Sequence, residues 1–112
     1  MVTNKDLEKI IEHYGAYPQI SKAVEELIEL SEVLIKDINK GVLNKNWILE
    51  EIADVTIMLE QLKIIYNIRL LDLNEEIDRK IERTMERIKS EPASGVYYDG
   101  KGNLLGIDTE GR

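Results

Sequence analysis

The sequence predicts an all-α protein of four helices, followed by a short β-hairpin tail. Apolar residues recur at helical spacing in four stretches, which Gly, Pro and Asn residues separate. Hydrophobic residues make up 43% and charged residues 33% of the 112 residues, a balance typical of a folded, highly charged helical protein. Because aromatic residues make up only 5%, Leu, Ile, Val and Met must form the core. We expect one helical domain over residues 1–90 and a tail over residues 91–112.

The first helix is expected over residues 4–14. Thr3 is a good N-cap, and Asp6 stands three residues after it. Gly15 and Pro18 then interrupt the helical pattern. The next helix is therefore expected to begin after this proline.

Two long helices are expected over residues 19–39 and 47–67. Gly41 is placed to end the first of them, while Asn44 and Asn46 are candidate N-caps for the second. The helix over residues 47–67 is apolar on most of its sides. A helix of this kind is usually a central one, so we expect it to pack both within the subunit and against another subunit.

The fourth helix is expected over residues 73–90. Asp72 and Glu75 have the spacing of a capping box at its start, and Pro92 is placed to end it. Its apolar residues form a single stripe. Residues 96–105 then predict a hairpin, because Asp-Gly and Gly-Asn pairs supply the positive φ angles of a turn.

Composition excludes several classes of site and partner. The net charge is −7, from 15 basic and 22 acidic residues, so nonspecific binding to nucleic acid is not expected. No apolar run reaches membrane-spanning length and the N-terminus is polar, so a cytoplasmic protein with no membrane partner is expected. There is no cysteine, and His13 is the only histidine. Thiolate and multi-histidine metal sites are therefore excluded.

Two acidic motifs lie on the second and third predicted helices, over residues 25–29 and 50–54. Their carboxylates stand three or four residues apart, on one helical face, where like charges repel. On a helical wheel, Glu51 falls in the middle of an apolar stripe and Asp54 falls beside it. A buried carboxylate costs several kcal/mol unless it is paired or neutralised. Glu51 therefore needs a metal ion, a basic side chain or a proton.

Glu26 lies at the edge of the apolar stripe of its helix. On the same helical wheel, Glu29 and Glu25 lie farther from this stripe, toward a face that could be solvated. Two carboxylates about 4 Å apart repel by roughly 4 kcal/mol at an effective dielectric constant near 20. Four converging carboxylates would therefore favour a counter-cation. Oxygen ligands alone select Mg²⁺ or Mn²⁺ over softer metals. The alternatives are a solvated acidic surface around Glu25 and a buried salt bridge at Glu51.

The fourth predicted helix carries a basic flank beside its apolar stripe. Lys80, Arg83 and Arg87 share this flank and could bind phosphate groups that face an acidic metal site. The alternative is a solvated face on which these side chains pair with Glu76.

These motifs together resemble the MazG-type nucleotide pyrophosphohydrolases, which are all-α enzymes. The resemblance covers about residues 17–90. It rests on three runs, which are Gln19-x-x-Lys22-x-x-Glu25-Glu26-x-x-Glu29, Glu50-Glu51-Ile52-Ala53-Asp54-Val55 and Ile77-x-x-Lys80-x-x-Arg83-x-x-x-Arg87.

The resemblance implies hydrolysis of an NTP or dNTP between the α and β phosphates, giving NMP and pyrophosphate. It also implies a four-helix bundle that a homodimer or homotetramer completes. By position, the Mg²⁺ ligands would be Glu26, Glu29, Glu51 and Asp54. Glu25 would be a further ligand or the base that activates water. Phosphate oxygens would meet Lys22, Lys80 and Arg83, with Arg87 on the same flank.

The residues that would bind the base are not identified by the sequence. His13 and Trp47 are weak candidates, for which core packing or an ordinary surface position is the alternative. Two other functions stay open. One is a non-catalytic helical interaction module, and the other is a relative of the same superfamily that acts on phosphoribosyl-ATP.

Overall fold

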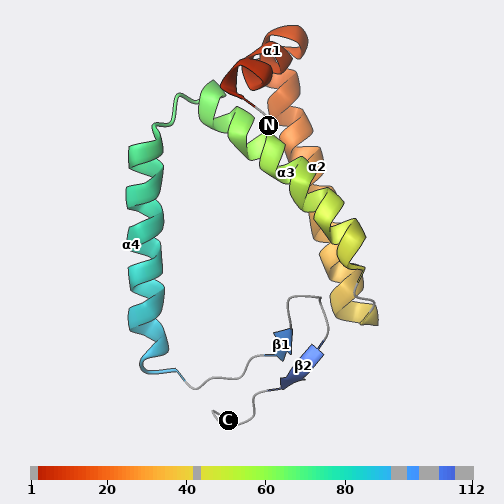
Figure 1. The fold of residues 1–112 in the computed structure, drawn as a ribbon, viewed down its shortest axis with the longest axis vertical. Helices are drawn as coiled ribbons and strands as arrows, with labels where there is room; N and C mark the ends of the chain where they lie inside the picture. The colour runs from red at the N-terminus through yellow and green to blue at the C-terminus, as the bar shows by residue number, and fades with distance from the viewer. Residues whose placement is uncertain (1–2, 42–43, 92–95, 99–103, 108–112) are drawn as a thin grey trace. The chain divides into compact units, whose positions relative to one another are not determined.

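The computed structural model of the chain describes residues 3–41, 44–91, 96–98 and 104–107. It divides into two compact units, Met1–Ile68 and Arg69–Arg112, which are described separately. The described residues form four helices and two short strands, confirming the predicted four-helix content. These elements are α1 (Asn4–Tyr14), α2 (Ala16–Lys40), α3 (Lys45–Ile65), α4 (Leu70–Ile88), β1 (Val96–Tyr98) and β2 (Leu104–Ile107) (Figure 1).

The bounds of α1 match the prediction, and a capping box fixes its start. The Thr3 hydroxyl accepts a hydrogen bond from the backbone N–H of Asp6 at 3.3 Å. In return, the Asp6 carboxylate accepts one from the backbone N–H of Thr3 at 3.0 Å. Two of the N–H groups that a helix start leaves unpaired are thereby satisfied. The hydrogen bonds that the Asp6 carboxylate accepts from the backbone N–H and the hydroxyl of Thr3 lower the pKa of Asp6.

Helix α2 begins three residues earlier than the sequence predicted, at Ala16. Pro18 does not interrupt it, because a proline in the first turn lacks only an N–H that would have no partner within the helix. At the other end the prediction is confirmed. Gly41 adopts a left-handed conformation with φ of 64°, and its N–H donates to the carbonyl of Asp37 at 2.8 Å.

Helix α3 begins at Lys45 with Asn44 as its N-cap, one of the two predicted candidates. The Asn44 side chain accepts a hydrogen bond from the backbone N–H of Trp47 at 3.1 Å. Helices α2 and α3 run antiparallel and pack against each other, and α1 contacts both (Figure 1). These three helices form the first unit and carry the site described below.

Helix α4 begins at Leu70, so the predicted capping box at Asp72 and Glu75 is wrong. Asp72 instead lies in the first turn, where its carboxylate accepts two hydrogen bonds from the Arg69 guanidinium, at 2.8 and 2.9 Å. This acid also raises the pKa of Arg69. Helix α4 ends at Ile88, and the predicted stop at Pro92 lies outside the described residues.

Strands β1 and β2 are antiparallel, with Val96 opposite Ile107 and an irregularity after Tyr97. The turn that the sequence predicts between them, at residues 99–103, lies outside the described residues. The hairpin as a whole therefore stays a prediction.

The core of the first unit is small and mixed in character. The buried apolar side chains are Leu7, Ala23, Val33, Val55 and Met58. Three polar side chains are buried with them, namely Gln19, Glu26 and Gln61. Many large apolar side chains of α2 and α3 are exposed, so the contacts within this unit leave apolar surface on both helices uncovered.

Within the described ranges, no helix combines the length and the apolar character that a membrane span requires.

Candidate metal centre

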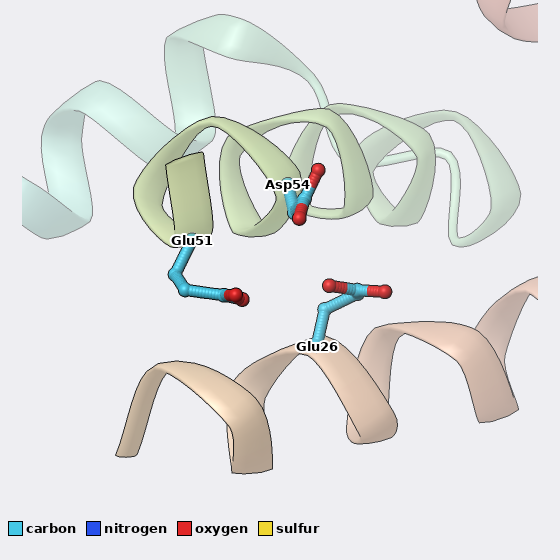
Figure 2. A group of neighbouring side chains, drawn as sticks. All are labelled: Glu26, Glu51 and Asp54. Carbon is cyan, nitrogen blue, oxygen red and sulfur yellow. The ribbon is translucent and has the colours of Figure 1, made fainter. Parts of the chain in front are cut away.

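Three carboxylates converge between α2 and α3. Glu26 extends from α2, while Glu51 and Asp54 extend from adjacent turns of α3 (Figure 2). One oxygen from each carboxylate lies within 4.8 Å of the other two. The spacing of three residues puts Glu51 and Asp54 on one side of α3. The antiparallel packing of α2 brings Glu26 to the same place. The structure thus brings together three of the four metal ligands that the sequence predicted.

Glu26 is the most buried member of the acidic cluster, with 6% of its surface exposed. Its Oε1 atom accepts a salt bridge from Lys22 Nζ at 3.3 Å. Its Oε2 atom is buried and has no hydrogen-bond partner among the residues that the structure describes. An unpaired carboxylate oxygen in this position costs stability, so Glu26 is a residue that could hold a metal ion here.

The sequence placed Glu51, rather than Glu26, at the centre of the buried stripe. In the structure Glu51 is only half-buried, although its Oε2 atom is buried and also lacks a partner within the described ranges. The prediction erred because both helices are apolar on more than one side. The buried row of α3 consists of Val55, Met58 and Gln61, whereas Ile52 and Leu59 are exposed.

Glu29, the fourth predicted ligand, lies on the exposed rim of the acidic cluster. The neighbouring carboxylate of Glu26 raises the pKa of Glu29, and desolvation and the charge of Glu51 raise it further. This coupling shows that Glu29 feels the negative charge of both helices. It is one helical turn after Glu26.

Lys22 offsets part of the negative charge of the acidic cluster through its salt bridge to Glu26. Its hydrogen bond to Glu26 and the charge of that carboxylate raise the pKa of Lys22. About half of the Lys22 side chain, 53%, is exposed, so it can turn toward a ligand at the rim. The predicted phosphate-binding residue is thus adjacent to the predicted metal ligands.

A pocket of about 570 Å³ adjoins the acidic cluster and is lined by residues of α1, α2 and α3. Glu25, Glu26 and Asp54 line its acidic side. Glu25 is exposed, which is compatible with contact to a water molecule or a substrate. Tyr14 lines the pocket on the α1 side.

Two buried glutamines, Gln19 and Gln61, also line this pocket, and the sequence had not identified them as site residues. Gln61 is only 1% exposed, and its Oε1 atom has no hydrogen-bond partner in the described part of the chain. A signal existed in the sequence. Gln61 follows Asp54 by seven residues, which is two helical turns on the same face of α3.

The two weak base-binding candidates line other pockets. Trp47 lines one of about 200 Å³ with Val33 and Lys36, and the Lys36 ammonium lies 5.1 Å from its ring centroid. The His13 ring stands edge-to-face against Tyr14, with 4.6 Å between centroids. Neither residue is in direct contact with the pocket beside the acidic cluster.

The basic residues of the fourth helix lie in the second unit. Lys80, Arg83 and Arg87 are exposed on α4. Lys80 lies 3.9 Å from Glu76, and Arg79 also pairs with this acid. These pairs are the solvated arrangement that the sequence left as an alternative. Contact of Lys80, Arg83 and Arg87 with phosphate stays a prediction.

Comparison with known proteins does not assign this chain to a family. No family model, curated protein or solved structure matches it. The functional assignment therefore depends on the geometry of the acidic cluster and on the residues of the adjoining pocket.

Proposed function

We propose that this protein is a Mg²⁺-dependent nucleoside triphosphate pyrophosphohydrolase of the MazG-like type. It would hydrolyse an NTP or dNTP between the α and β phosphates and serve nucleotide-pool clean-up in the cytoplasm. One observation carries the proposal. Three carboxylates from two helices converge, and the buried Glu26 Oε2 atom has no partner within the described residues.

The donor set fits a hard divalent cation. Glu26, Glu51 and Asp54 supply oxygen atoms alone, the ligands that Mg²⁺ and Mn²⁺ prefer, and Glu29 would be the fourth ligand, as the resemblance implies. A cation would offset the repulsion among these groups and the desolvation of Glu26. When bound, such an ion polarises a phosphoryl group, lowers the pKa of a coordinated water and aligns the attack.

Two further residues of α2 have roles that follow from their positions. Lys22 would exchange its contact with Glu26 for a phosphate oxygen, because a cation at Glu26 would compete for the same carboxylate. Glu25 lines the pocket beside Glu26 and would accept a proton from the attacking water. Lys80, Arg83 and Arg87 would complete the phosphate contacts, as the resemblance implies.

We further propose that a homodimer or homotetramer completes the four-helix bundle. The support is the exposed apolar side of α2, where Val24, Ile28, Ile35 and Ile38 are each more than half exposed. Monomeric proteins rarely expose apolar surface of this extent in one patch. The same observation favours a second candidate function, a non-catalytic helical module that uses this side for assembly.

The test is a panel of NTPs and dNTPs, with phosphoribosyl-ATP included, incubated with the protein and Mg²⁺. The products are then identified by ³¹P NMR. We expect NMP and pyrophosphate from at least one nucleoside triphosphate. Release of NDP and inorganic phosphate, or turnover of phosphoribosyl-ATP alone, would contradict the proposed reaction. No turnover of any substrate would favour the non-catalytic module.

A further inference from the structure

The pocket beside the acidic cluster has a chemical character of its own. It shares Glu26 and Asp54 with the cluster and extends from them toward α1. Away from the charged side chains of Lys22, Glu25, Glu26 and Asp54, its wall includes the apolar side chains of Ile10, Pro18, Ile57 and Met58. A ligand whose charged end lies at the carboxylates would therefore place an apolar, or flat and weakly polar, portion against this wall.

Gln61 is the polar group in this wall that folding does not explain. It is 1% exposed, lines the pocket and belongs to the buried row of α3 with the apolar Val55 and Met58. Its side-chain oxygen has no hydrogen-bond partner among residues 3–41, 44–91 and the two strands. An unsatisfied buried amide destabilises a protein, whereas a leucine of similar size would not. The amide is therefore expected to be paired when a ligand is bound.

The volume and the walls of the pocket limit the ligand. The pocket has about 570 Å³, within the range of small-molecule sites, and can enclose a heterocyclic ring. An amide offers one acceptor and one donor side by side, the complement of the polar edge of a nucleobase. A sugar would leave the apolar walls without a matching surface.

We propose that Gln61 is a specificity-determining residue that binds the N–H edge of the substrate's nucleobase in this pocket. The inference rests on the proposed function, because the triphosphate of the same molecule would lie at the acidic cluster. A protein with this arrangement distinguishes nucleotides from triphosphates that lack a base.

The experiment compares the wild type with Gln61→Leu, which keeps the volume of the side chain and removes its amide. Binding of the free nucleosides adenosine, guanosine, cytidine, uridine and thymidine is followed by NMR titration. We expect at least one nucleoside to bind the wild type and Gln61→Leu to weaken that binding about 10-fold or more. No binding of any nucleoside, or equal binding by both proteins, would overturn the inference.

Kinetics and stability separate this role from a structural one. Gln61→Leu should lower kcat/KM for nucleoside triphosphates about 10- to 100-fold. It should not lower the Tm, because it removes an unpaired buried oxygen. A fall in Tm together with loss of activity would show a structural role and overturn the inference. Thr56→Val, which removes an exposed hydroxyl bonded to the Ile52 carbonyl, is the matched control on α3 and should change none of these quantities.

The two proposals can fail independently. If the wild type hydrolyses no nucleotide, the proposed function fails. If the wild type hydrolyses nucleotides but Gln61→Leu retains full kcat/KM for them, only the inference about Gln61 fails.

Discussion

The two sides of helix α2 have opposite characters, and each is unlike what folding of a single chain would select. The side that packs against α1 and α3 contains two polar side chains among its buried residues, which are Gln19, Ala23, Glu26 and Val33. The other side presents apolar side chains to solvent, namely Val24, Leu27, Ile28, Ile35 and Ile38. Burying polar groups and exposing apolar ones both cost stability. The comparison supports the two proposals made above, that one side binds a metal ion and the other a second subunit.

The largest expected effect is on activity and comes from the carboxylates of the acidic cluster. Glu26→Gln and Glu51→Gln should each lower the rate of nucleotide hydrolysis at least about 100-fold. Changing a residue that only hydrogen-bonds to a metal ligand already lowers metal affinity or activity about 10- to 100-fold. Both variants keep the size of the side chain, so circular dichroism should show unchanged helix content. Glu32→Gln, on the exposed part of α2, is the control. Full activity of either cluster variant would show that the metal assignment is wrong.

The next effect tests the apolar side. Replacing Ile28 and Ile35 by Lys places two charges in the proposed subunit interface, where both side chains are now more than half exposed. Light scattering should show the wild type as a dimer or tetramer and the double variant as a monomer of 12.9 kDa. The change Glu8→Lys, at an exposed position of α1, alters the net charge by the same amount outside this side of α2 and should keep the oligomer. A monomeric wild type would contradict the proposed role of this side.

Metal should stabilise the folded protein by a smaller but measurable amount. Free Mg²⁺ at about 100 times its dissociation constant adds about 2.7 kcal/mol to the free energy of unfolding. For a domain of this size the Tm should rise by about 10 °C. Glu26→Gln should abolish most of this rise. A melting curve that responds to neither Mg²⁺ nor Mn²⁺ would instead favour the non-catalytic module.

The smallest effect concerns pH and Glu29. Because the pKa of Glu29 is raised in the folded protein, chiefly by Glu26, the charged form destabilises the metal-free protein. The penalty is present above the raised pKa and disappears as the pH falls below the ordinary value of 4.5. Glu29→Gln should therefore be more stable than the wild type at pH 7 and equal to it near pH 4. If the free energies of unfolding of the two proteins differ by the same amount at pH 4 and at pH 7, the coupling between Glu29 and Glu26 is refuted.

The sequence predicted local structure best where a single residue decides it. Thr3 starts α1 and Gly41 ends α2 as expected, because a hydroxyl cap and a left-handed glycine act over only a few residues. Pro18 misled the prediction, since a proline stops a helix only beyond its first turn. The start of α4 was missed because Asp72 pairs with Arg69 rather than capping the helix.

The sequence predicted which acidic residues lie together at the site but not which of them are buried. Spacing put Glu51 and Asp54 on one face of α3, because a three-residue interval fixes a helical face, and the family resemblance added Glu26 of α2 to them. Wheels could not decide which side of α2 or α3 faces inward, since each has apolar residues on two sides. They therefore favoured Glu51 over Glu26. Gln61 was missed because a neutral amide adds nothing to the acidic pattern, although it shares a face of α3 with Asp54.

The most direct test of the central claim is a titration with Mn²⁺, followed by electron paramagnetic resonance of the free ion. The claim is that the inward carboxylates of α2 and α3 form a metal site. We expect the wild type to remove Mn²⁺ from solution, and Glu26→Gln to bind it at least about 10-fold more weakly. Equal binding by the two proteins, or no binding by the wild type, would contradict the account.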